Sequence, residues 1–310
     1  MPLHPQVQAH LERLAGSNFA DLHTFAPEQV RQAMRLMTQS LGTGEAVARV
    51  CDRAISTRAG ELPVRIYHPQ PDERRPVIVF FHGGGFVLGD LDTHDGLARA
   101  LANRTGRVVV SVDYPLAPEH KYPAAINAGF AATQWVALHG GEIGADGTDI
   151  AVAGDSAGGN LAAVVALMAR DAGAPAITHQ VLIYPDLDFR RSNVSIQEFA
   201  GQYGNISRAT QQWFMNHYLN DAHEKLDAHV SPLLAPSLKQ LPPALIVTAE
   251  FDALRDEGGQ YGARLQQAGV PTTVNRYDGM IHEFMRWPFD DAARALEDIA
   301  AALPAVPPPN

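Results

Sequence analysis

The sequence predicts an α/β fold, with a mostly parallel central sheet flanked by helices and a helical cap. Short apolar runs alternate with helical patterns along most of the chain, as in sheets whose parallel strands are joined by helices. Two glycine-rich segments each follow a predicted strand directly, HGGGF at His82–Phe86 and GDSAGG at Gly154–Gly159. The 310 residues, of which 46% are hydrophobic, supply enough apolar side chains for a large core.

Each strand is predicted from a short run rich in β-branched or apolar residues. Strand-like stretches within 47–67 surround an expected turn at 58–60, and further strands are predicted at 77–81, 108–112, 150–153, 180–184, 244–248 and 272–277. Helices are expected at 124–138 and at 158–169, the latter directly after the second glycine-rich segment. The order therefore alternates between strands and helices.

Two regions stand outside this alternation. Apolar residues recur at helical spacing before the first strand, at Leu3, Val7, Leu11 and Leu14 and again at Val30, Ala33, Met34 and Met37. A second region, 186–228, has no strand signal but holds an aromatic helix with Trp213, Phe214 and Tyr218. Both regions could be packing helices, but we expect them to cap the carboxyl ends of the strands. The expected division is a cap at 1–45 and 189–228 over a core at 46–188 and 229–310.

The GDSAGG segment fits G-x-S-x-G, in which glycines let a serine occupy a cramped strand-to-helix turn with its hydroxyl exposed. Ser156 is therefore the candidate nucleophile. The HGGGF segment can direct backbone N–H groups toward the oxygen of a carbonyl that this serine attacks. Together the two segments predict an acyl-transfer hydrolase.

A serine nucleophile needs a base, and in chains with this turn the order is serine, acid, histidine. Five histidines follow Ser156, namely His179, His217, His223, His229 and His282. Only His282 lies beyond the last predicted strand, in an expected loop at 278–284, so it is the candidate base. The acid should follow the strand at 244–248. Asp252 is favoured there because its short side chain lies nearest the strand end, and the alternatives are Asp256, Glu250 and Asp278.

With these residues in place, the chain resembles the bacterial hormone-sensitive-lipase-like carboxylesterases that carry a G-D-S-A-G turn. The matching segments are HGGGFVLG at 82–89, DYPLAPEH at 113–120, GDSAGGN at 154–160, FDALRD at 251–256 and IHEF at 281–284. The resemblance extends from about residue 45 to the end, and the N-terminal helices resemble the family's cap. It implies the α/β-hydrolase fold. Pro115 departs from the family, which more often has arginine there.

The resemblance implies roles for particular residues. Ser156, Asp252 and His282 would form the catalytic triad, and His82 would order its loop. Backbone N–H groups of Gly84, Gly85 and Ala157 would hold the oxyanion, with Gly83 as a further candidate. Candidate substrate contacts are Phe86, Asp155, Met34, Phe214 and Ile281.

The expected activity is hydrolysis of short- to medium-chain acyl esters, a small-molecule reaction that needs no metal or organic cofactor. An amidase, peptidase or lactonase could use the same triad, and related plant hormone receptors keep the fold without the catalytic histidine. Asp92, His94 and Asp95 could ligate a cation, although a solvated helix start explains them better. No nucleotide-binding glycine motif occurs.

The composition of the chain limits which kinds of partner it can bind. The net charge of −10 argues against nucleic acid, whose phosphates demand a basic face. No run of about eighteen apolar residues is present, so no membrane span is expected. Cys51 is the only cysteine, which excludes an internal disulfide. Residues 1–16 carry His4, His10, Glu12 and Arg13 where a signal peptide needs an unbroken apolar stretch, so a cytoplasmic location is expected. A homodimer is compatible with the sequence.

Overall fold

The computed structural model describes residues 2–14, 22–40, 42–58, 60–204 and 206–306. Ala59, the middle of the expected turn at 58–60, lies outside them. In order, the helices and strands are α1 Pro5–Leu14, α2 Pro27–Ser40, β1 Arg49–Thr57, β2 Gly60–His68, β3 Arg75–Phe81, α3 Asp95–Thr105, β4 Val108–Val112, α4 Ala124–His139, β5 Ala145–Asp155, α5 Ala157–Ala172, β6 His179–Ile183, α6 Val194–Phe199, α7 Arg208–Tyr218, β7 Ala244–Phe251, α8 Arg255–Gln267, β8 Thr272–Ile281 and α9 Asp290–Ala302. Short 3₁₀ turns lie at Gly140–Ile143, Ala222–Leu226, Pro232–Leu234 and Phe284–Arg286.

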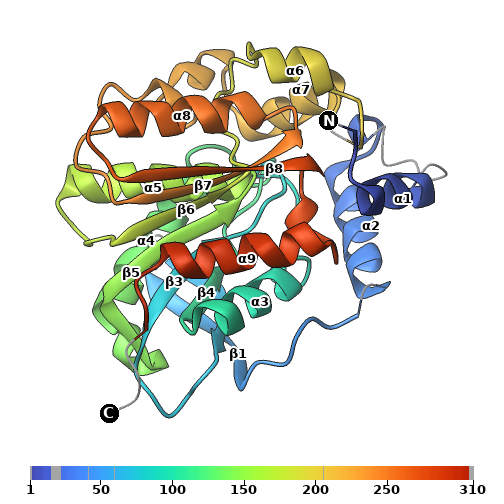
Figure 1. The fold of residues 1–310 in the computed structure, drawn as a ribbon. Coiled ribbons are helices and arrows are strands. Elements are labelled where there is room, and N and C mark those ends of the chain that lie inside the picture. The colour runs from blue at the N-terminus through green and yellow to red at the C-terminus, as the bar shows by residue number, and fades with distance from the viewer. Residues whose placement is uncertain (1, 15–21, 41, 59, 205, 307–310) are drawn as a thin grey trace.

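Within the described residues, eight strands form one twisted sheet in the order β1-β2-β4-β3-β5-β6-β7-β8 (Figure 1). β2 is antiparallel to both β1 and β4, and every pairing from β4 through β8 is parallel. The predicted α/β fold with a mostly parallel sheet is confirmed.

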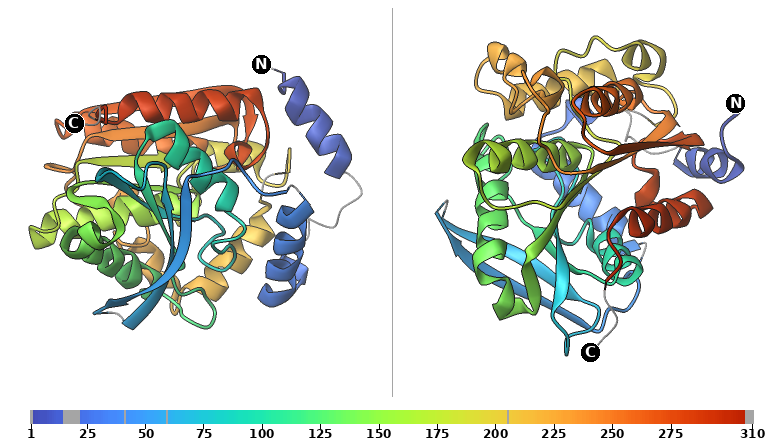
Figure 2. Two further views of the ribbon diagram at one scale, coloured as in Figure 1. Left: turned by 90° about the horizontal axis from the view of Figure 1, so that it is seen from below. Right: turned by 60° about the vertical axis from the view of Figure 1, so that its left-hand side comes forward.

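Side chains of each central strand alternate between two apolar cores. In β3, Val77, Val79 and Phe81 pack into the core shared with α4, α5 and α8. Ile78 and Phe80, which point to the opposite face, join the core shared with α3 and α9. All five side chains are fully buried, as expected for a parallel strand covered on both faces. Figure 2 shows these helix layers on the two sides of the sheet.

The remaining helices gather at the end of the molecule toward which the parallel strands point. There α1 and α2 lie at the same end of the molecule as α6 and α7, although they are far from them in sequence (Figure 1). Arg31 of α2 ties that helix to the core, because its guanidinium donates to the carbonyl oxygens of Val87 and Ala117, at 2.8 Å each.

One boundary differs from the sequence prediction and bears on the site. β8 continues to Ile281, so residues 278–281 are strand rather than loop. Pairing resumes after an irregularity, with Phe251 of β7 opposite Ile281. His282 therefore follows the strand directly, on a rigid support. No helix in the part of the chain described is both long and apolar enough to cross a bilayer.

Candidate active site

Ser156 occupies the sharp turn between β5 and α5. Its φ of 55° lies in the left-handed region, which a residue with a Cβ adopts only at a cost. The turn brings Gly158 against β3, so that a Cβ there would collide with the carbonyl oxygen of Phe81. The Ser156 N–H donates to the carbonyl oxygen of Ile183, 2.9 Å away, which fixes the turn against β6. Tertiary packing thus stabilises a strained backbone that presents the hydroxyl.

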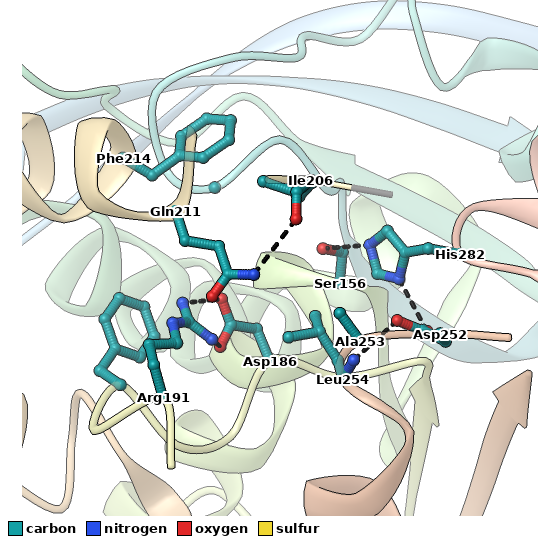
Figure 3. Close-up of a pocket in the computed structure, with 12 residues that line it drawn as sticks. Ser156, Asp186, Arg191, Ile206, Gln211, Phe214, Asp252, Ala253, Leu254 and His282 are labelled. Carbon is teal, nitrogen blue, oxygen red and sulfur yellow. Dashed lines mark hydrogen bonds and ion pairs between the residues drawn. The ribbon is translucent and has the colours of Figure 1, made fainter. Parts of the chain in front are cut away.

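Three side chains from distant segments meet at this turn. His282 Nε2 lies 3.0 Å from Ser156 Oγ, and His282 Nδ1 lies 2.8 Å from Asp252 Oδ2 (Figure 3). The other carboxylate oxygen of Asp252 accepts the N–H of Leu254 at 2.8 Å. All three side chains are buried, with Ser156 5%, His282 8% and Asp252 1% exposed. The arrangement can pass a proton from the hydroxyl to the imidazole and hold the resulting cation beside a carboxylate.

The electrostatics of the imidazole follow from two opposing effects. Burial by itself lowers the pKa of His282, but the acidic neighbours, of which Asp252 contributes most, together outweigh burial and raise the pKa of His282 to about 9. Glu283 and Asp155 act in the same direction. The site therefore favours the imidazolium form, which is the form created when serine loses its proton.

The other candidate acids are engaged elsewhere. Asp256 accepts the N–H of Ser195 at 2.8 Å, and Glu250 accepts the N–H of Gly279 at 2.8 Å. Asp278 pairs with a neighbouring arginine of β8. Among the described carboxylates, Asp252 is the one that contacts His282 Nδ1.

The glycine-rich loop faces the same serine. Gly84 and Gly85 line the larger of two cavities that meet at Ser156. In the described part of the chain, no protein acceptor takes the N–H of Gly84, Gly85 or Ala157. The N–H of Gly83, the further candidate, is engaged within the protein, because it donates to Asp155 Oδ1 at 2.9 Å.

Two cavities of unequal size share Ser156 and His282. The larger, about 820 Å³, is bordered by α1, α2 and α7 and includes the predicted contacts Met34, Phe214 and Ile281. The smaller, about 30 Å³, is lined by Phe214 and by the Asp186–Arg191 ion pair, whose closest approach is 2.6 Å (Figure 3).

Two predicted substrate contacts line neither cavity. Phe86 is 1% exposed because its ring stacks on Tyr218, with centroids 4.1 Å apart. Asp155 is fully buried behind the turn, where it binds the glycine-rich loop. His82 is also fully buried. Its ring stacks on Tyr114 at 4.3 Å, and its Nδ1 donates to the carbonyl oxygen of Gly83 at 2.8 Å.

The residues considered as a cation site do not surround a common point, because Asp92 and Asp95 both contact Arg65 Nη1, at 2.8 and 3.4 Å, whereas His94 faces Asp155. Asp92 pairs with Arg65, and Asp95 accepts from the hydroxyl of Tyr67 at 2.8 Å. His94 is buried at the start of α3 and faces Asp155. The described residues contain no group of three or more His, Cys, Asp or Glu side chains that could hold a metal ion.

Sequence reasoning did not single out Arg191 and Asp186 at the smaller cavity, nor the contact between His94 and Asp155. Arg191 lies in a polar segment without periodicity, so no pattern in the sequence marks its burial. His94 stands among acidic residues at a helix start, which indicates a solvated position. Only the fold brings these groups beside Ser156.

A family model described as the α/β-hydrolase fold matches residues 78–286. Esterase LipI of Mycobacterium tuberculosis is 46% identical over 264 residues, which cover 83% of this chain and 81% of that protein. Ethyl acetate hydrolase of Pseudomonas putida is 34% identical and covers 92% of this chain and 93% of its own length. The solved structure of a hyperthermophilic esterase from Pyrobaculum calidifontis superposes with a TM-score of 0.94 at 42% identity, and covers 97% of this chain and 98% of that one.

Proposed function

We propose that Ser156, His282 and Asp252 act as the catalytic triad of this protein. The chain belongs to the α/β-hydrolase fold family and is a hormone-sensitive-lipase-like carboxylic ester hydrolase. The observation that carries the assignment is the pair of contacts at 3.0 and 2.8 Å that link the three side chains.

The reaction follows from this geometry in two steps. Ser156 Oγ attacks the acyl carbonyl while His282 Nε2 takes its proton, and Asp252 stabilises the imidazolium. The free N–H groups of Gly84, Gly85 and Ala157 are the donors proposed to hold the tetrahedral oxyanion. His282 then protonates the departing alcohol. Water, activated by the same imidazole, repeats the attack and releases the acid.

The triad assignment is tested with Ser156→Ala. We expect kcat for p-nitrophenyl acetate to fall by a factor on the order of 10⁶, because the nucleophile is lost while the fold stays intact. A fluorophosphonate probe should label the unmodified protein at Ser156 and leave the variant unlabelled. Near-normal turnover by the variant would refute the assignment. Absence of labelling in the unmodified protein would favour a ligand-binding role.

Short- to medium-chain acyl esters are the proposed substrates. The two cavities support this choice, because the smaller one admits only a short group beside Ser156 while the larger offers about 820 Å³. The relative named ethyl acetate hydrolase points the same way. A series of p-nitrophenyl esters from acetate to palmitate should give a maximum of kcat/KM at short or medium length. A maximum of kcat/KM at palmitate would contradict the proposal. A second comparison uses an ester and the amide of the same acid, and an amide hydrolysed as fast as its ester would favour an amidase.

The division into cap and core is also a proposal. Residues 1–45 and 189–228 would form the cap over the core at 46–188 and 229–310. Lining residues of the larger cavity come from α1, α2 and α7 as well as from the core, which supports this division.

Two further proposals concern the assembly and its location. β8 forms one edge of the sheet, and an edge strand can pair with a second copy, which supports a homodimer. Cys51 is an exposed free thiol, which suits a reducing compartment and supports a cytoplasmic location. Light scattering after size exclusion would report the mass in solution, and cell fractionation would report the location.

A further inference from the structure

Asp155, the residue before the nucleophile, binds the loop proposed to hold the oxyanion. Its side chain is completely buried and lines neither cavity. Oδ1 accepts the N–H of Gly83 at 2.9 Å. The contact is close, because a Cβ built on Gly83 would lie 2.6 Å from Asp155 Oδ2. The carboxylate of one glycine-rich segment therefore anchors the backbone of the other.

The anchored loop has an unusual backbone. Gly84, Gly85 and Phe86 have φ values of 123°, 61° and 63°, so three successive residues lie in the region that favours glycine. The carbonyl oxygen of Gly84 accepts the N–H of Leu88 at 2.8 Å. Asp155 thus ties the loop at Gly83, just before the free N–H groups, and the Gly84 carbonyl, which shares a peptide unit with the N–H of Gly85, ties it between them. The free N–H groups are those of Gly84 and Gly85.

His94 supports the anchor from the other side. Its Nε2 lies 3.5 Å from Asp155 Oδ2, and both side chains are fully buried. Its Nδ1 lies 3.1 Å from the hydroxyl of Thr93, which fixes the ring at the start of α3. Burial disfavours the charge on Asp155, but His94 first and then Arg286 outweigh it and keep the pKa of that carboxyl below its usual range. An ionised carboxylate is the stronger acceptor for the N–H of Gly83.

We propose that Asp155 and His94 are positioning residues that hold the Gly83–Gly85 loop in the conformation that binds the oxyanion. The inference rests on the proposed function, in which this loop stabilises the tetrahedral intermediate. Donors of this kind are effective because they are oriented before the reaction and need no rearrangement during it. Without the bond at Gly83, the free N–H groups of Gly84 and Gly85 lose their fixed direction.

The experiment compares Asp155→Ala, Asp155→Asn and His94→Ala with the unmodified protein. For each variant, kcat and KM are measured with p-nitrophenyl acetate, and kcat is expressed per active site, counted by titration with a fluorophosphonate. The inhibition constant of a trifluoromethyl ketone is measured as well, because this inhibitor forms a tetrahedral oxyanion on serine. We expect Asp155→Ala to lower kcat about 100-fold, as loss of an oxyanion donor does, and to weaken ketone binding in parallel. Asp155→Asn keeps an oxygen acceptor for Gly83 and should recover most of the loss. His94→Ala should fall between the two.

Asp149→Asn is the matched control, since Asp149 lies on the same strand, away from the loop, and pairs with Arg107. It should lower the melting temperature and leave kcat and ketone binding unchanged. The proposal is overturned if Asp155→Ala keeps kcat per titrated site and ketone binding within about twofold of the unmodified protein. If Asp155→Ala does not fold, unchanged kcat per titrated site and unchanged ketone binding in His94→Ala overturn it equally. Failure of the unmodified protein to hydrolyse esters would instead refute the proposed function.

Discussion

At the residue scale, the charge on one carboxylate governs how the imidazole of the site titrates. Ordinary imidazole has a pKa near 6.5, and Asp252, with smaller contributions from Glu283 and Asp155, raises the pKa of His282 to about 9 against the effect of burial. A histidine with a raised pKa contributes stability that is fully present below about pH 6.5 and is lost as the pH rises through about 9. Catalysis has the opposite requirement, because only neutral His282 can accept the serine proton.

These facts predict the pH dependence of the reaction. The rate at which a fluorophosphonate labels Ser156 should rise with pH, and the midpoint of this rise should lie above 6.5, toward 9. The reason is that His282 becomes neutral, and able to accept the serine proton, only as the pH rises through its pKa. Asp252→Asn should lower the labelling rate about 10⁴-fold and move the midpoint down, because the charge that stabilises the imidazolium is gone. Asp256→Asn, which changes a neighbouring carboxylate bound to Ser195, should leave the midpoint in place. If Asp252→Asn leaves the midpoint unchanged, a group other than His282 controls the rise of the labelling rate with pH.

The sequence predicts residues of the site unevenly, for a physical reason. Ser156 and His282 stand at positions fixed by the order of strands, so their neighbourhood follows from the topology. Asp155 shares a motif with the nucleophile but is fully buried and lines neither cavity, because it binds the N–H of Gly83 behind the turn. A motif gives residue types and spacing, whereas the direction of each side chain depends on the backbone around it.

At the element scale, the strands are the best predicted part and several helices the worst. Apolar runs identify the central strands such as β3 and β4, because burial on both faces demands continuous apolar sequence. α8 escapes notice because it contains Gly258, Gly259 and Gly262, which are poor helix formers. Gly262 lies where a Cβ would collide with Val274 of β8, so the glycine allows the helix to pack closely on the sheet. Here tertiary contacts outweigh local propensity.

The anchoring of α2 gives a prediction at this scale. Arg31 is 9% exposed, donates to the carbonyl oxygens of Val87 and Ala117 and pairs with Glu119 at 2.8 Å. Arg31→Met leaves these acceptors without a donor, which should destabilise the protein by about 1–3 kcal/mol. Because Met34 of the same helix lines the larger cavity, KM for bulky esters should rise more than KM for p-nitrophenyl acetate.

Arg35→Met provides the comparison for this variant. Arg35 lies one turn along α2, is 43% exposed and pairs with Asp90, so its loss should cost less than about 1 kcal/mol. Chemical denaturation and the two KM values measure both effects. Equal stability and equal KM shifts in the two variants would show that Arg31 does not anchor the helix over the cavity.

At the scale of the whole molecule, the fold separates stability from catalysis along the sheet. Catalytic candidates lie beyond the carboxyl ends of β5, β7 and β8 (Figure 3). The segment near the opposite end of β5 is tied by Arg107, whose side chain is completely buried. Its guanidinium contacts Asp149 at 3.1 Å and donates to the carbonyl oxygen of Pro304 at 3.0 Å, which joins β4, β5 and the C-terminal segment.

This separation predicts that the two properties can be changed independently. Asp149→Asn leaves the buried Arg107 without its counter-charge, and removal of one partner of a buried pair costs about 3–5 kcal/mol. Asp149 is 30% exposed, so solvent reduces the penalty and we expect about 2–3 kcal/mol. A loss of this size should lower the melting temperature by roughly 4–12 °C, while kcat/KM for p-nitrophenyl acetate at 25 °C stays within about twofold. Calorimetry and steady-state kinetics on one preparation measure both quantities. If kcat/KM per titrated site falls together with the melting temperature, the two ends of the sheet are coupled. The disturbance at Asp149 would then reach Ser156 through β5.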